Sequence, residues 1–480
     1  MAFIIIPEII LIITILLLVI LKIIFNKKIK NILFFITAIC GTVTSIITLL
    51  LINIYANNEY QILFGGRFIF NKESFYFKIL FLLIALIIIL ISWERSSSNN
   101  IKNIFFDHCG EFYSILLTSI CGAMFLVSSN DIITLYISLE MATIPIYILI
   151  AWNETSISGE AGLKYALLGM FSSVFILLGF SYIYGATGET SFYNIFLIIE
   201  NNNLLYFISI LLIIAVGFKM ALVPFHMWIA DVYYGASTTI TAYLAVFSKI
   251  LGLSLIIQLF YKIIGNNIIV ESTFLISCIA AITMTVGNIL AITQSNIKRI
   301  MAYSSISQAG YLLMGFIGGQ NEGIIAIIYY SLVYIVSNLT AFSVIIYFER
   351  KFNATDLKDY KNLSQISPVM SLMLLLALFS LAGIPPLSGF VGKFFLFSIA
   401  ANQKVYWLVL LAAINSTISL YYYLNIIKSM YIEKQVKIYK SHIFNSSILN
   451  STAFITTISI VLLTVIPFFY ETIYINIINI

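Results

Sequence analysis

Residues 204–228 have the sequence LLYFISILLIIAVGFKMALVPFHMW. The run is long enough to cross the ~30 Å hydrocarbon core of a bilayer as a helix, yet it contains Lys219 and Pro224. Proline removes a backbone donor and clashes with the preceding turn. An interrupted helix at membrane depth is tolerated only where protein or water satisfies the freed polar groups. The stretch therefore predicts a membrane helix that breaks beside a buried amine.

The whole chain has the composition of a membrane protein. Of its 480 residues, 61% are hydrophobic and 9% are charged, whereas soluble domains carry about 25% charged residues. Apolar runs near 20 residues recur and are continuous rather than alternating, which favours a helix bundle over a β-barrel. The net charge of +5 comes mostly from residues between the runs, where topology requires them, so no nucleic-acid partner is expected. The four cysteines are scattered, which argues against metal or iron–sulfur sites.

The apolar runs predict about 14 membrane spans. Because no long linker or low-complexity segment divides them, we expect residues 1–480 to form a single polytopic domain. The predicted spans are 3–25, 31–56, 76–93, 110–128, 131–151, 161–184, 204–228, 238–262, 271–292, 300–318, 322–349, 368–398, 405–428 and 452–472.

The basic residues predict the orientation of these spans. Lysines and arginines follow the first, ninth, eleventh and thirteenth spans, while the loops near 185–203, 263–270 and 319–321 contain none. The positive-inside rule then places both termini outside. Arg67 and Lys72, in the loop at 57–75, fit this pattern less well.

A second span is interrupted in the same way. The sequence GIPPLSG at residues 383–389 breaks the twelfth span, five spans after the break at Pro224. This spacing suggests two repeats, 110–262 and 271–428, flanked by helices within 1–93 and 452–480. Paired interruptions in corresponding halves point to an ion pathway. A pair of packing kinks is the alternative interpretation.

Four ionisable residues are predicted at membrane depth: Glu140, Lys219, Lys249 and Lys393. A charge at the centre of a membrane helix costs about 2.5–3.5 kcal/mol on insertion scales, so such residues are usually functional. A lysine suits a proton relay because the charge of its amine responds both to burial and to a nearby carboxylate. The alternatives are a protonated structural glutamate and lysines whose amines reach the interface along their stems.

Other polar residues are weaker candidates for the relay. Lys164, near the start of its span, can equally extend to the interface, and His226, just after Pro224, can equally be a hydrogen-bonded structural residue. Lys22 and Lys78 lie at predicted span ends and are interpreted as interface anchors. Candidate hydroxyl links between the relay residues, each also explicable by helix packing, are Ser248, Tyr303, Ser304, Ser305 and Ser307.

Three stretches resemble the antiporter-like subunits of respiratory complex I, the proton-pumping NADH–quinone oxidoreductase. They are FKMALVPFHMWIADVY at 218–233, KRIMAYSSIS at 298–307 and GIPPLSGFVGKF at 383–394. The sequence EAGLKYALLG at 160–169 makes the N subunit, called subunit 2 in mitochondria, the most similar of these. The resemblance runs from about residue 110 to 430. It implies an all-α integral membrane fold of 14 helices with two inverted five-helix repeats and broken helices 7 and 12.

The resemblance also implies roles for the buried residues. Glu140 is expected to pair with Lys219, Lys249 to relay protons on a central polar axis, and Lys393 to face the exit or a neighbouring subunit. Many relatives carry a histidine at the position of Gln308. Glutamine does not titrate, so a proton step there must use water or another residue.

Cofactors and most partners are expected elsewhere in such a complex. No dinucleotide fingerprint or P-loop occurs in the sequence, so we expect this chain neither to bind NADH nor to hydrolyse ATP. The resemblance implies that NAD, FMN, iron–sulfur clusters and quinone belong to partner subunits, and that other membrane-arm subunits and the lipid bilayer contact this chain. The expected location is a bacterial plasma membrane, or alternatively the mitochondrial inner membrane. A subunit of a multisubunit cation/proton antiporter and a non-pumping structural subunit remain the alternative functions.

Overall fold

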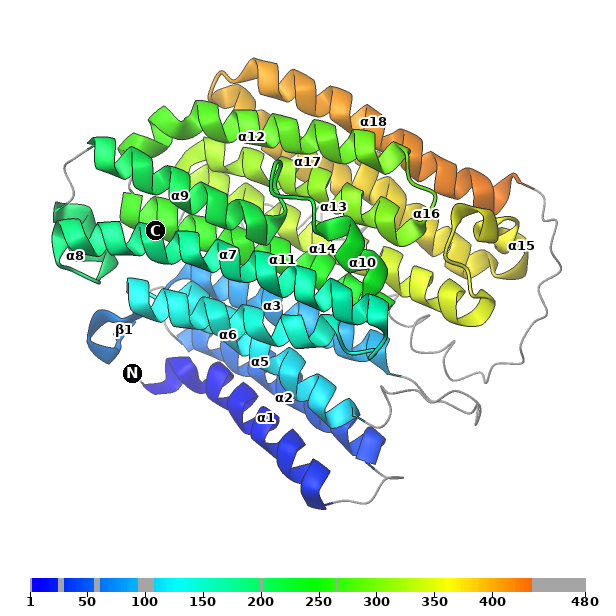
Figure 1. Cartoon of the computed structure of the whole chain (residues 1–480), viewed down its shortest axis with the longest axis horizontal. Coiled ribbons are helices and arrows are strands. Elements are labelled where there is room, and N and C mark those ends of the chain that lie inside the picture. The colour runs from blue at the N-terminus through cyan, green and yellow to red at the C-terminus, as the bar shows by residue number, and fades with distance from the viewer. Residues whose placement is uncertain are drawn as a thin grey trace.

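The computed structural model describes residues 2–24, 30–55, 61–93, 108–198, 202–264 and 266–433. Within these ranges the chain is almost entirely helical (Figure 1). The helices are α1 (Ile6–Ile24), α2 (Lys30–Tyr55), α3 (Lys72–Ser92), α5 (Cys109–Ser128), α6 (Ile132–Ile150), α7 (Ser156–Thr187), α8 (Phe192–Ile198), α9 (Asn202–Met220), α10 (Ile229–Gly235), α11 (Thr238–Ile256), α12 (Asn266–Ile292), α13 (Ile297–Met314), α14 (Ile324–Phe352), α15 (Leu363–Ile366), α16 (Pro368–Ala382), α17 (Ser388–Asn402) and α18 (Tyr406–Tyr431).

Shorter elements complete the described chain. Two strands, β1 (Gln61–Leu63) and β2 (Phe68–Phe70), pair as an antiparallel hairpin. Short 3₁₀ turns lie at Ala2–Ile5, Phe64–Gly66, Gly315–Gly318 and Leu357–Tyr360, and π-helical turns lie at Ile257–Ile264 and Gly319–Gly323.

The predicted membrane spans are confirmed wherever the structure describes them. Eleven helices of the described chain are long and apolar enough to cross a bilayer, and two shorter apolar segments, Leu204–Met220 and Pro368–Ala382, belong to the spans predicted to break. The span predicted at 452–472 lies outside the described residues. The orientation from the positive-inside rule and the boundaries of the two repeats stay predictions.

Both predicted breaks are present. α9 ends at Met220, and the chain runs through a non-helical segment before α10 begins at Ile229. α16 ends at Ala382, and α17 begins at Ser388. α16 and α17 have 15 residues each and are too short to cross the hydrocarbon alone. Both breaks leave backbone polar groups without helical partners inside the bundle.

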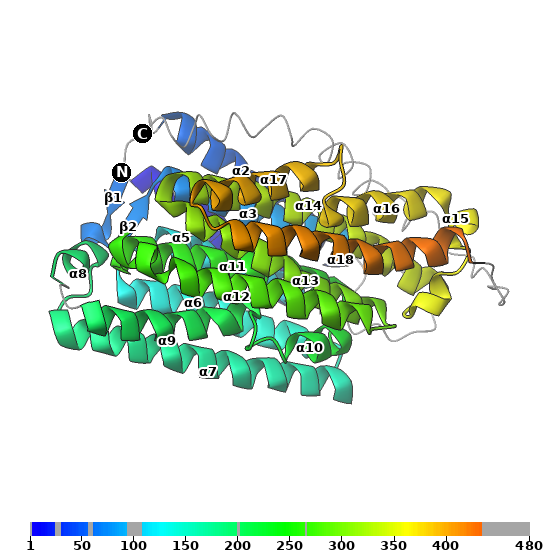
Figure 2. The same cartoon turned by 90° about the horizontal axis from the view of Figure 1, so that it is seen from above.

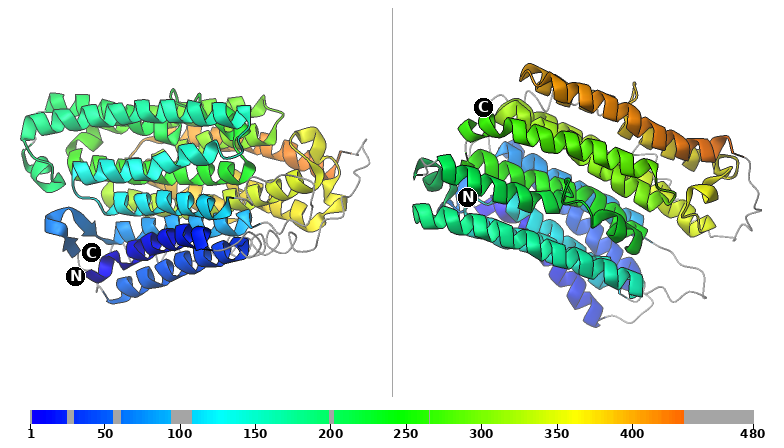
Figure 3. Two further views of the ribbon diagram at one scale, coloured as in Figure 1. Left: turned by 60° about the horizontal axis from the view of Figure 1, so that its bottom comes forward. Right: turned by 45° about the horizontal axis from the view of Figure 1, so that its top comes forward.

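The helices run roughly parallel in every view (Figure 3). α1 and α2 lie at one edge of the bundle and α18 at the opposite edge (Figure 1). α11, α13 and α14 lie in the interior. In the apolar stretch of each helix, the share of residues that are buried is 100% for α11 and 94% for both α13 and α14. Polar side chains on these three helices are therefore shielded from lipid.

The hairpin β1–β2 was not predicted. It occupies the loop expected at 57–75 and lies with α8 at one end of the bundle, while α15 lies at the other end (Figure 2). α3 begins at Lys72 rather than at 76, because the Asn71 side chain accepts a hydrogen bond from the backbone N–H of Ser74 and so caps the helix.

The interpretation of Lys78 as an interface anchor is wrong. Its side chain is completely buried, and its Nζ lies 2.6 Å from Oε1 of Glu8, which is also completely buried. The earlier start of α3 moves Lys78 from the helix end into the packed bundle.

The second break depends on a close approach of its two half-helices. An ideal Cβ at Gly389 would lie 1.7 Å from the carbonyl oxygen of Ser380. Gly389→Ala should therefore destabilise the fold by about 2 kcal/mol, measured as a lower melting temperature of the detergent-extracted protein. Gly159→Ala is the matched control, because a Cβ there meets no atom within 4 Å and alanine favours the helix. Equal melting temperatures for the two variants would contradict this packing.

Candidate functional site

At the first break, side chains form hydrogen bonds with backbone groups that the helix leaves unpaired. Trp228 Nε1 donates to the carbonyl oxygen of Phe218 at 3.2 Å, and the backbone N–H of Val223 donates to Thr283 Oγ1 of α12 at 3.2 Å. These bonds satisfy groups that the helix no longer pairs, as an apolar surrounding requires. The break is therefore stabilised by specific hydrogen bonds. Lys219 lies one residue before the end of α9.

Lys219 and Glu140 lie near one another without forming a hydrogen-bonded pair. The Lys219 side chain is 5% exposed, and its amine has no hydrogen-bond partner among the described residues. Glu140 is half-buried; its carboxylate accepts from Ser173 Oγ at 2.5 Å and from Thr143 Oγ1 at 3.5 Å. The two charges interact electrostatically. The arrangement thus supplies a carboxylate and an amine whose interaction can change with small movements.

Lys249 lies in the middle of α11 and is completely buried. Within the ranges that the structure describes, its amine has no hydrogen-bond partner; it faces the rings of Trp228 and Tyr233, whose centroids lie 6.0 and 5.9 Å away. Trp228 also lines a small cavity of about 10 Å³ beside Lys219. The tryptophan that closes the first break is therefore a neighbour of both lysines.

The second break contains the third buried lysine. Lys393 is 3% exposed, and its Nζ donates to the free carbonyl oxygen of Ala382 at 2.9 Å. The ring centroid of Tyr311 lies 4.4 Å from the same nitrogen. Gln308 Nε2 donates to the carbonyl oxygen of Leu381 at 3.1 Å. Lys393 and Gln308 thus donate hydrogen bonds to the last two carbonyl oxygens of α16.

Two tyrosines on α14 connect the two breaks, and sequence reasoning missed both. Tyr334 OH donates to the carbonyl oxygen of Ala245 at 2.9 Å. Ala245 lies on α11, one turn before Lys249. Tyr330, one turn earlier on α14, donates to Oε1 of Gln308. Both rings are buried. The sequence signal was the presence of tyrosines at i and i+4 within a predicted span, which places them on one helix face.

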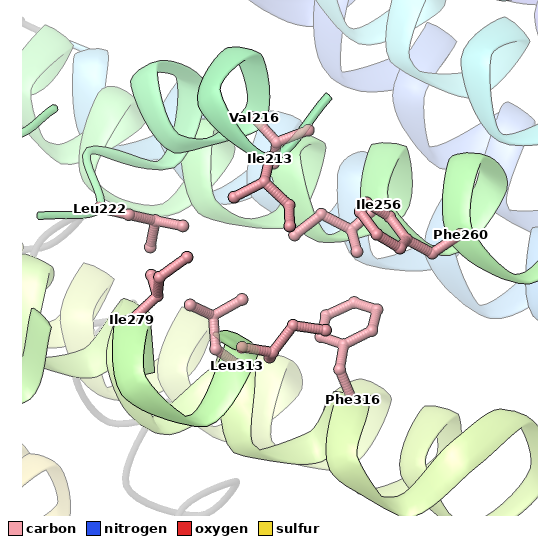
Figure 4. A pocket seen from close by; sticks show the side chains of 9 residues that line it. Ile213, Val216, Leu222, Ile256, Phe260, Ile279, Leu313 and Phe316 are labelled. Carbon is pink, nitrogen blue, oxygen red and sulfur yellow. The ribbon is translucent and has the colours of Figure 1, made fainter. Parts of the chain in front are cut away.

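An apolar wall separates α9 and α11 from α12 and α13 on another side of the bundle. Aliphatic and aromatic side chains meet there around a cavity of about 20 Å³ (Figure 4). The lining residues are Ile213, Val216, Leu222, Ile256, Phe260, Ile276, Ile279, Leu313 and Phe316. Because the residues that line this wall are apolar, it provides no polar connection between the halves; the polar contacts lie elsewhere, at the Tyr233–Ser305 and Val223–Thr283 contacts and on α14.

The two weaker candidates lie in different surroundings. Lys164 lies in the third turn of α7 and is half-exposed, with Nζ 2.8 Å from Glu160 and 3.0 Å from Asp231. His226 is half-buried in the first break, and its Nδ1 has no hydrogen-bond partner. The structure thus groups His226 with the break and Lys164 with a surface ion-pair cluster.

The predicted hydroxyl links divide into two groups. Ser304 lies 2.5 Å from Tyr423 OH, and Ser305 lies 3.4 Å from Tyr233 OH, so both join neighbouring helices. Ser248 and Ser307 donate to backbone carbonyls of their own helices, and Tyr303 is only half-buried. Within the described ranges, no group of three or more His, Cys, Asp or Glu side chains could hold a metal ion.

Broken helices with buried lysines beside them define a class of membrane subunits, and comparison with known proteins identifies it. The family described as "NADH:quinone oxidoreductase/Mrp antiporter, TM" matches residues 129–419. NADH-quinone oxidoreductase subunit N of Desulfitobacterium hafniense is 38% identical over 387 residues, covering 76% of this chain and 77% of the relative. The same subunit of Azobacteroides pseudotrichonymphae is 40% identical over 376 residues, covering 78% and 77%.

Solved structures have the same fold. A chain of respiratory complex I from Thermus thermophilus with bound Aureothin superposes with a TM-score of 0.80 at 25% identity, covering 97% of this chain and 98% of that one. A chain of the Mrp complex from Dietzia sp. gives 0.82 at 17% identity, covering 98% and 97%, and shows the fold alone. This chain belongs to the family of subunit N, an antiporter-like membrane subunit of NADH–quinone oxidoreductase. The predicted family is confirmed.

Gln308 provides a test of how the second break is held. Gln308→Leu leaves the Leu381 carbonyl and the Tyr330 hydroxyl without their buried partner, which costs about 1–3 kcal/mol. The melting temperature of the complex that contains this variant should fall. Gln308→His retains a ring nitrogen that can donate and should keep most of the stability. A leucine variant as stable as the histidine variant would show that these bonds do not hold the break.

Proposed function

We propose that this chain moves protons across the membrane through a line of buried ionisable residues: Glu140, Lys219, Lys249 and Lys393. The observation that carries the proposal is the position of the three lysines. All three are at most 5% exposed, two lie at helix breaks, and two have amines that find no hydrogen-bond partner in the described part of the chain.

Burial of three amines would be costly if their only role were structural. An uncompensated charge in an apolar surrounding is strongly unfavourable, and ionisable residues within membrane spans usually mark ion pathways. Hydrophobic side chains of similar size would pack these positions without that cost. A proton carrier accounts for the retained amines because its function requires a group that can be both charged and neutral.

The contacts suggest an order for the relay. Glu140 and Lys219 interact at the start, and Trp228 links the environments of Lys219 and Lys249. From α11 the polar contacts continue through Tyr334 and Tyr330 to Gln308, which shares the second break with Lys393. Tyrosine hydroxyls can donate and accept, so with water they can pass a proton past the non-titrating Gln308.

The energy for transport must come from outside this chain. Moving one charge against the membrane potential costs about 2.3 kcal/mol per 100 mV. We infer that quinone reduction in partner subunits, which hold NAD, FMN and iron–sulfur clusters, drives a change in the Glu140–Lys219 interaction. Such driving requires two states that the partner interacts with differently. The half-buried Glu140 lies on α6 between the exposed residues Ile137 and Ile144, where a neighbouring subunit can act on it.

The chain would work in the bacterial plasma membrane. Its matched relatives named subunit N are bacterial, and complexes of this kind contain several membrane subunits beside it. If the chain were a purely structural membrane-arm subunit, variants of the buried residues would translocate protons at the wild-type rate.

Substitution of the buried residues tests the relay. Glu140→Gln, Lys249→Met and Lys393→Met keep side-chain size but remove the titrating group. In membrane vesicles that contain the assembled complex, NADH-driven proton translocation should fall by about tenfold or more for each variant, while the amount of assembled complex stays unchanged. Proton uptake is followed with a pH-sensitive dye.

Lys358→Met is the matched control, because Lys358 is an exposed lysine in the turn at Leu357–Tyr360. It should translocate protons at the wild-type rate. If all three buried variants also do so, the relay is refuted and the structural role is favoured. Sodium-dependent transport by the isolated complex would instead favour a cation antiporter.

A further inference from the structure

A second pair of buried ionisable residues lies outside the relay, among the N-terminal helices. Glu8 is in the first turn of α1, and Lys78 is in the second turn of α3. Lys78 Nζ lies 2.6 Å from Glu8 Oε1, and both side chains are 0% exposed. In the part of the chain that the structure describes, neither the amine nor either carboxylate oxygen has a hydrogen bond to any other group.

The hairpin β1–β2 covers this pair. The ring centroids of Phe68 and Phe70, both on β2, lie 4.9 and 5.1 Å from Lys78 Nζ, and both rings are buried. Aromatic faces attract an ammonium group, yet they exclude water. The hairpin lies at the end of the bundle that the basic-residue pattern places outside (Figure 2). The pair is therefore close to the outer surface but sealed from it.

The hairpin is in turn attached to the first repeat. Asn130, in the turn between α5 and α6, donates from its backbone N–H to the Arg67 carbonyl at 3.0 Å and from Nδ2 to the Gly66 carbonyl at 2.9 Å. The next residue, Asp131, caps α6, the helix that carries Glu140. A displacement of α6 would therefore move the cover over the Glu8–Lys78 pair.

Polar groups on α5 and α2 lie beside the pair. The Cys121 thiol on α5 is completely buried and interacts electrostatically with both Glu8 and Lys78. Two residues earlier on α5, Ser119 hydrogen-bonds to Tyr243 OH on α11, the helix of Lys249. On the other side, Ser45 of α2 donates to the Pro7 carbonyl at 3.2 Å. Arg67 and Asp131, 4.0 Å apart, are the charged residues of the hairpin and its anchor.

Stability does not account for this pair. Two charges lose more on desolvation than they regain unless further hydrogen bonds satisfy them, and well-packed hydrophobic replacements are often as stable. The Glu8–Lys78 pair lacks such additional bonds, so a role that requires its charge is the better explanation.

We propose that Glu8 and Lys78 form a second proton-exchange site, on the outer side of the bundle and covered by the hairpin; this inference rests on the proposed proton transport. A proton passes from Lys78 Nζ to Glu8 Oε1, so that one N–H bond breaks and one O–H bond forms, leaving a neutral amine and a neutral acid. The amine then accepts a proton that leaves Nζ of Lys249 and is passed along the hydroxyls of Tyr243 and Ser119, so that Lys249 becomes neutral until the relay protonates it again. When the hairpin moves, the acid releases its proton to outer water, which restores the ion pair.

Lys78→Arg separates proton exchange from a structural role. Arginine keeps the positive charge and can pair with Glu8, but it does not release its proton in proteins. The double variant Glu8→Gln/Lys78→Gln provides a neutral, hydrogen-bonding pair that cannot exchange protons. Both variants should assemble into the complex at the wild-type level and lower NADH-driven proton translocation in vesicles by about tenfold.

A matched control pair joins the same helix to α5. Lys22 of α1 pairs with Glu111 of α5, but these side chains are 38% and 36% exposed. Lys22→Met/Glu111→Leu should leave proton translocation unchanged. Lys249→Met, measured in parallel, tests the relay itself, so that failure of the proposed function is distinguished from failure of this inference.

Two outcomes would overturn the second site. Wild-type translocation in both Lys78→Arg and the double glutamine variant, with Lys249→Met inactive, would leave the relay standing and reduce the pair to a helix contact. Loss of assembly in both variants would assign it a purely structural role.

Discussion

A polar group inside hydrocarbon must find its partner within the protein, and this constraint shapes the whole bundle. Breaking α9 and α16 frees carbonyl and amide groups at depths where lipid offers nothing. At the first break Trp228 and Thr283 supply the missing partners, and at the second Gln308 and Lys393 do so. Each break therefore requires polar side chains as hydrogen-bond partners, and these residues line the interior that the proposed proton route would use.

The two breaks use their lysines differently. Lys393 donates directly to the end of α16, so its amine is part of the structure that holds the break. Lys219 has no such bond, and the first break is closed by a tryptophan instead. The first half thus has an amine free to respond to Glu140, whereas the second half has an amine fixed in place. This asymmetry suits a pathway that is driven from the first half and ends in the second.

The sequence was sufficient for features that depend on position along the chain. Helix length, the proline breaks and the position of Lys249 in the middle of its helix follow from counting residues at helical rise, and the structure agrees with each. Contacts between helices that are distant in the sequence could not be predicted from it. Gln308 bonds a carbonyl 73 residues away, and continuous runs of isoleucine and leucine mark no buried face. Lys78 was misjudged because capping at Asn71 started α3 before its apolar run.

The position of α14 explains how two halves separated by an apolar wall can still act together. A proton cannot cross the contact of Ile213, Leu313 and their neighbours, because nothing there accepts or donates a hydrogen bond. α14 packs against α11 on one side and against α16 and α17 on the other. Its two tyrosines, one turn apart, reach from the carbonyl near Lys249 to the glutamine at the second break. For the proposed relay, this helix face provides a polar route between the halves, as does the Tyr233–Ser305 contact, whereas the apolar wall provides none.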